Sequence, residues 1–99
     1  MHFIIASDRL SRNLRDALRR CGYFGIQDRI SNTISYVRRL SKAQHYPRFH
    51  LYIEELPKGY KFNLHLDQKK GRYQGARAHS ADYDEETVRE EAERIKGLI

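Results

Sequence analysis

The chain has 99 residues, of which 39% are hydrophobic and 11% aromatic, and its formal net charge is +6 at pH 7. This length is sufficient for one small core and too short for two, and the apolar content excludes a disordered tail. We therefore expect a single globular domain over residues 1–99.

The sequence indicates a protein of a reducing compartment. Cys21 is the single cysteine and cannot form an internal disulfide. Because Cys21 falls on the apolar side of a predicted helix, we interpret it as a buried thiol. The sequence has neither a secretory leader nor an apolar run of about 18 residues. These features predict a cytoplasmic protein without a membrane span.

Positive charge is concentrated in the first four fifths of the chain. Residues 1–80 carry 16 basic and 6 acidic side chains, whereas residues 81–99 carry 3 basic and 7 acidic ones. Such an asymmetry is typical of a surface that binds polyanions, and it also occurs on ordinary solvated helix faces.

The N-terminal residues predict a short strand and a helix. Residues 2–6 are apolar and can form an edge strand. A helix is expected from Ser7 or Asp8, either of which can cap it, to about Cys21. Its apolar stripe follows the 3.6-residue period and consists of Leu10, Leu14, Ala17, Leu18 and Cys21. The opposite side carries Arg12, Arg15 and Arg19.

A second helix is expected from Gln27 to Lys42, after a tight connection with a glycine at each end. Helical spacing would bury Ile30, Ile34, Val37 and Leu40. The basic residues of its last turn would complement the helix dipole.

Alternating apolar residues predict an antiparallel β-hairpin over residues 49–67, with turn residues at Pro57–Gly59. One side of the hairpin would be buried. The other side would display His50, Tyr52, Glu54, Lys61, Asn63, His65 and Asp67. A register that pairs Glu54 with Lys61 places His50 opposite His65, with Asp67 one step along, whereas a different turn would shift these partners.

The remaining residues predict a loop and a helix. A polar loop with two glycines is expected from Gln68 to Tyr83, and loops of this length in small domains are either mobile or functional. Asp84 can cap a final helix that packs on the apolar side of the hairpin. The predicted fold class is α+β: two N-terminal helices, a hairpin that residues 2–6 can extend to three strands, and a C-terminal helix.

The order of these elements over Leu10–Asp67 resembles the later half of a winged-helix domain. That resemblance implies a second helix in the major groove of DNA and a hairpin that serves as the wing. The predicted strands are long and apolar for a wing, which favours a hairpin that belongs to the core.

Nucleic-acid binding is the function that we expect first. Lysine and arginine bind phosphates, and an aromatic side chain can stack on a base. The expected contacts lie on the first helix and in the loop: Arg12, Arg15, Arg19, Lys69, Lys70, Arg72, Tyr73 and Arg77. The sequence contains no Walker A or RNP motif, so the pattern does not distinguish RNA from DNA.

Two other classes of function remain open. A phosphodiesterase or nuclease, metal-dependent or histidine-based, would use His50, His65, Asp67 and His79, although solvated histidines are commoner than catalytic ones. A protein-interaction module or homo-oligomer would pair an exposed strand edge, or set the acidic C-terminal helix against the basic part of a second copy. No cofactor motif is present, so we expect no cofactor.

Overall fold

The computed structural model describes residues 1–68 and 77–99, without the side chains of residues 77–84. In chain order its elements are strand β1 (His2–Ala6), a short 3-10 turn (Ser7–Arg9), helix α1 (Leu14–Arg20), strands β2 (Phe24–Asp28), β3 (Thr33–Arg39), β4 (Arg48–Leu56) and β5 (Gly59–Asp67), and helix α2 (Arg77–Leu98).

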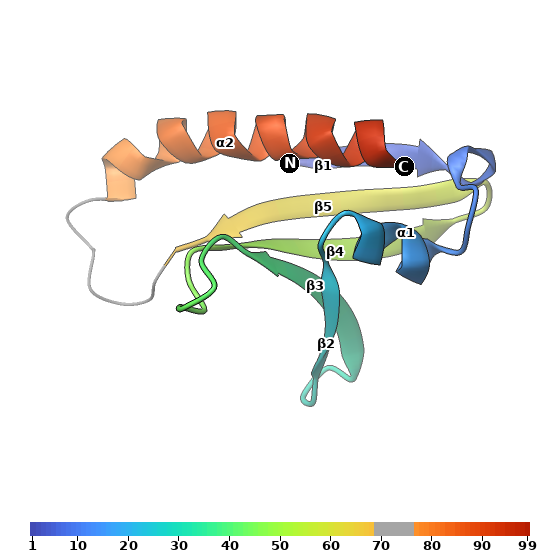
Figure 1. Ribbon diagram of the computed structural model, residues 1–99, viewed down its shortest axis with the longest axis horizontal. Coiled ribbons are helices and arrows are strands. Elements are labelled where there is room, and N and C mark those ends of the chain that lie inside the picture. Colours follow the sequence, from blue (N-terminus) through green and yellow to red (C-terminus); the bar gives the residue numbers. More distant parts are fainter. Residues whose placement is uncertain (69–76) are drawn as a thin grey trace.

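The strands of the described residues form one antiparallel, five-stranded sheet in the order β1-β5-β4-β3-β2 (Figure 1). The predicted hairpin is β4 and β5, and of the registers left open it adopts the one that pairs Glu54 with Lys61 and His50 with His65. The predicted N-terminal strand is also confirmed, as β1 pairs with β5 from the other side.

One face of the sheet forms the core together with both helices. Leu51, Phe62 and Leu64 point to this face and are fully buried. Helix α1 contributes Leu18 to the same cluster, and α2 contributes Val88, Ala92 and Ile95. The C-terminal helix therefore packs on the apolar side of the hairpin, as predicted. The alternation along β4 and β5 directs His50 and its neighbours to the opposite face, which we call the open face.

The predicted helix over residues 27–42 is wrong, because these residues form a second β-hairpin from β2 and β3. The backbone turns where Asp28 Oδ1 accepts the N–H of Ile30 at 2.9 Å, and Asn32 adopts a positive φ of 58°. Side-chain turns of this kind compete with a helix, and β-branched residues, which favour strands, follow in β3. Ile30, which a helix would bury, is 98% exposed at the hairpin tip.

This hairpin also overturns the predicted arrangement of two N-terminal helices, so the likeness to a winged-helix domain does not extend to the structure. The fold remains α+β. Within the described residues, α1 is the one α-helix before the sheet strands β2–β5.

The helix boundaries differ from the prediction at two places. Helix α1 begins at Leu14 because Asn13, rather than Ser7 or Asp8, caps it: Asn13 Oδ1 accepts the backbone N–H of Asp16 at 2.9 Å. Helix α2 begins at Arg77 rather than at Asp84, so the predicted loop is shorter at its C-terminal end. No helix of the described residues is long and apolar enough to cross a membrane.

Candidate functional site

A groove of about 350 Å³ lies between α1 and the β2–β3 hairpin. Two arginines of α1, Arg15 and Arg19, form one wall. They are one helical turn apart and therefore project from the same side of the helix. The other residues that line the groove include three aromatic ones, Tyr23, Phe24 and Tyr36. Among the described residues that line it, none is acidic.

The aromatic part of the groove is open to solvent at Phe24, whose residue surface is 60% exposed. The guanidinium of Arg19 lies 6.0 Å from the centroid of the Phe24 ring. A Cβ at Gly25 would be in van der Waals contact with Ile34, at 3.4 Å, and with the ring of Tyr36, at 3.5 Å. The groove thus combines positive charge with accessible aromatic surface.

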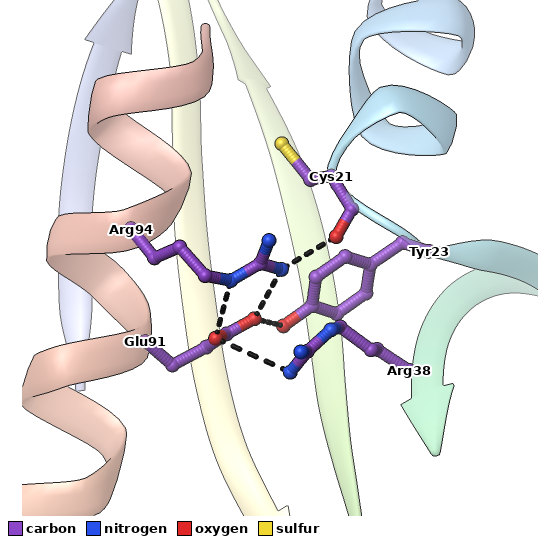
Figure 2. A network of polar contacts seen from close by, with 5 residues as sticks. All are labelled: Cys21, Tyr23, Arg38, Glu91 and Arg94. Carbon is purple, nitrogen blue, oxygen red and sulfur yellow. Dashed lines mark hydrogen bonds and ion pairs between the residues drawn. The ribbon is translucent and has the colours of Figure 1, made fainter. Parts of the chain in front are cut away.

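A buried network of hydrogen bonds and ion pairs holds Tyr23, which also lines the groove (Figure 2). Glu91 of α2 is 5% exposed, and its Oε2 accepts a hydrogen bond of 2.7 Å from the Tyr23 hydroxyl. Arg94 donates to both carboxylate oxygens, at 2.8 and 2.9 Å, and to the carbonyl of Cys21. Arg38 of β3 lies 3.4 Å from Oε1. The network therefore joins α2, the end of α1 and β3.

The surroundings of the network raise the pKa of three groups, Tyr23, Arg94 and Cys21. Burial, with the hydrogen bond to Glu91, raises the pKa of the Tyr23 phenol far above its usual range. The hydrogen bond to Glu91 also raises the pKa of Arg94. Burial raises the pKa of the Cys21 thiol, so its predicted role as a buried thiol is confirmed and a thiolate nucleophile is disfavoured.

A second polar cluster lies on the open face of the sheet. His50 Nδ1 is 3.0 Å from Asp67 Oδ2, and His50 Nε2 is 2.8 Å from Ser35 Oγ. The ring of Tyr52 stacks on His50 with centroids 4.5 Å apart, and His65 meets Tyr52 edge-on at 5.7 Å. Desolvation lowers the pKa of His65, so its imidazole is neutral at pH 7.

The structure brings together three of the four residues predicted for catalysis. His50 and Asp67 are hydrogen-bonded, and His65 lies across the strand pair from His50. The side chain of His79 lies outside the described part. Among the described residues, no three His, Cys, Asp or Glu side chains are arranged to hold a metal ion.

The residues predicted for nucleic-acid contacts separate into three groups. Arg15 and Arg19 share the groove, whereas Arg12 lines a smaller pocket of about 210 Å³ beside the end of α2. Lys69, Lys70, Arg72 and Tyr73 lie outside the described residues, as does the side chain of Arg77.

Sequence reasoning missed Ser35, Phe24 and Tyr36. Ser35 and Tyr36 were placed in a helix, where neither would face the histidines of the hairpin or the arginines of α1. The alternation of β-branched and polar residues in "TISYV" was the available signal for a strand. Comparisons with protein-family models, curated proteins and solved structures found no match for this chain.

Proposed function

We propose that the protein binds nucleic acid in the groove between α1 and the β2–β3 hairpin. The observation that carries this proposal is the pairing of two arginines with the exposed ring of Phe24 in one groove, which no carboxylate of the described residues lines. Guanidinium groups bind phosphate oxygens through charge-assisted hydrogen bonds. Aromatic side chains stack on bases whatever their identity. In this arrangement, Arg15 and Arg19 bind phosphates and Phe24 stacks on a base.

Single-stranded nucleic acid fits this groove better than a duplex does. A base must be unstacked to lie against Phe24 or Tyr36, and duplex bases already stack on their neighbours. The basic residues of the sequence outside the groove, Arg12, Lys69, Lys70, Arg72 and Arg77, support the proposal through the long-range attraction of a polyanion, which increases the association rate.

Fluorescence anisotropy with single-stranded and duplex RNA and DNA over a salt series tests this function. We expect single strands to bind more tightly than duplexes, with a log–log salt slope of about −1.4 if two phosphates are contacted. Replacing both Arg15 and Arg19 by Ala should weaken binding at least tenfold and flatten the slope. Phe24→Ala should weaken binding about tenfold because each stacked base contributes about 1–3 kcal/mol.

Arg89→Ala provides the matched control for charge, since Arg89 is an exposed arginine on α2 that does not line the groove. It should change the dissociation constant less than twofold. Binding that is absent, that does not depend on salt, or that Arg89→Ala weakens as much as the groove variants would contradict the proposal.

The edge strand β2 favours a second candidate function, self-association. All five residues of β2 are exposed, and the strand has no Lys or Pro that would discourage edge pairing. Phe24 and Ile26 add apolar surface to this edge, since they are 60% and 38% exposed. Multi-angle light scattering should then show a dimer whose fraction rises with concentration, and Ile26→Lys should return it to monomer. A monomer at all concentrations would exclude this function.

A further inference from the structure

Ser35, His50 and Asp67 form a continuous hydrogen-bonded chain across three neighbouring strands, β3, β4 and β5. The two ring nitrogens of His50 have different partners in this chain. Nδ1 of His50 faces the carboxylate at 3.0 Å, and Nε2 faces the serine hydroxyl at 2.8 Å. This is the assignment that an activated serine requires, because the carboxylate fixes the tautomer in which Nε2 accepts the hydroxyl proton.

We propose that Ser35 is a nucleophile that accepts acyl groups from small activated esters on the open face of the sheet. As Ser35 Oγ bonds to the carbonyl carbon, His50 Nε2 takes the Oγ proton and Asp67 stabilises the imidazolium. The bond to the leaving oxygen then breaks, and that oxygen takes the proton from His50. Water, with His50 as the base, hydrolyses the acyl-serine and releases the acid.

The neighbours of the chain hold His50 and Asp67 in place. The Tyr52 ring lies on His50 at 4.5 Å and restricts its rotation. Arg48 Nε is 3.5 Å from Asp67 Oδ2, and this ion pair helps to hold the carboxylate beside His50. Arg48 Nε is also buried without a hydrogen-bond partner among the described residues.

Burial of the serine limits the size of the acyl group. Ser35 is 6% exposed, so an acetyl group can reach Oγ more readily than a branched or long acyl chain. The two hydrogen bonds of the chain supply a base and its orienting carboxylate, and neither supplies a donor for the developing oxyanion. Since each missing oxyanion donor costs about 10²–10³ in kcat, we expect slow deacylation, accumulation of acyl-serine and reaction with activated phenyl esters rather than with amides.

Reaction with p-nitrophenyl acetate tests this activity. The wild-type protein should release a burst of at most one p-nitrophenol per chain, and peptide mapping should place the acetyl group on Ser35. Ser35→Ala and His50→Gln should each reduce the burst rate at least 100-fold. His45→Gln is the matched control, because His45 is an exposed histidine of the segment before β4 and lies outside the hydrogen-bonded chain. It should retain the wild-type rate within about twofold.

Peptide mapping of the wild-type protein makes the test independent of how the variants fold. Acetylation confined to lysines or to other histidines, or a burst that persists in folded Ser35→Ala protein, would overturn the proposal. Nucleic-acid binding in the groove does not use these residues, so the outcome leaves the proposed function to its own test.

Discussion

Glu91→Ala is expected to lower the free energy of unfolding by about 3 kcal/mol, because it removes the common acceptor of a buried network. The Tyr23 hydroxyl loses its 2.7 Å hydrogen bond and remains buried. The side chains of Arg94 and Arg38 are 34% and 30% exposed, so water can replace part of the interactions that they lose. The loss should therefore lie at the lower end of the range for a broken buried ion pair.

Urea denaturation of Glu91→Ala beside Glu93→Ala measures this effect with a matched control. Glu93 lies on the same helix, and its side chain is 69% exposed in an ion pair with Lys96. Its removal should change the free energy of unfolding by less than about 0.5 kcal/mol. Tyr23→Phe should have an intermediate effect of about 1–2 kcal/mol, since one charged hydrogen bond is lost. Equal losses for both glutamates would show that the network does not hold α2 on the sheet.

Gly59→Ala is expected to destabilise the protein by about 3 kcal/mol, because a methyl group there overpacks the contact between β1 and β5. Gly59 pairs with Ala6 at the edge of the sheet. A Cβ would overlap the backbone carbonyl oxygen of Ile5 and lie 3.0 Å from the Cα of Ala6. Backbone atoms of a paired strand cannot move aside singly, so β1 must shift or detach.

Gly97→Ala is the control for the same substitution in open space. A Cβ at Gly97 in the last turn of α2 meets no atom within 4 Å. Alanine has a higher helix propensity than glycine, so the free energy of unfolding of this variant should rise by up to about 1 kcal/mol. Thermal unfolding should give melting temperatures that move in opposite directions for the two variants. Equal melting temperatures would contradict the tight contact between β1 and β5.

The parts of the fold with one clear hydrophobic period could be predicted from the sequence. Residues 49–53 and 60–67 alternate, so the hairpin and the residues on each of its faces followed from period 2, whereas the register depended on the turn. The apolar stripe of α2 gave its packing face in the same way. Residues 27–42 have apolar side chains that fit helical spacing. The turn at Asp28 and Asn32 favours a β-hairpin instead. The hydrophobic period alone does not show whether such a turn or a helix is the more stable structure.

The candidate sites depend on contacts between distant residues and were only partly predictable. His50 and Asp67 lie on one predicted hairpin, so their shared face followed from alternation. Ser35 reaches His50 only because β3 pairs with β4. Arg19 could be predicted on an exposed helix face, but its position beside Phe24 depends on the path of the chain from the end of α1 to β2. Neither long-range contact is encoded in local spacing.

Mapping of backbone amide shifts by NMR on titration with a single-stranded oligonucleotide is the most direct measurement of where nucleic acid binds. We predict that the largest shifts fall on Arg19, Phe24, Gly25 and Tyr36, which surround the groove, and that they diminish as salt is added. Shifts that are absent at saturating oligonucleotide, or that are confined to the open face around Asn63 and His65, would contradict the groove as the binding site.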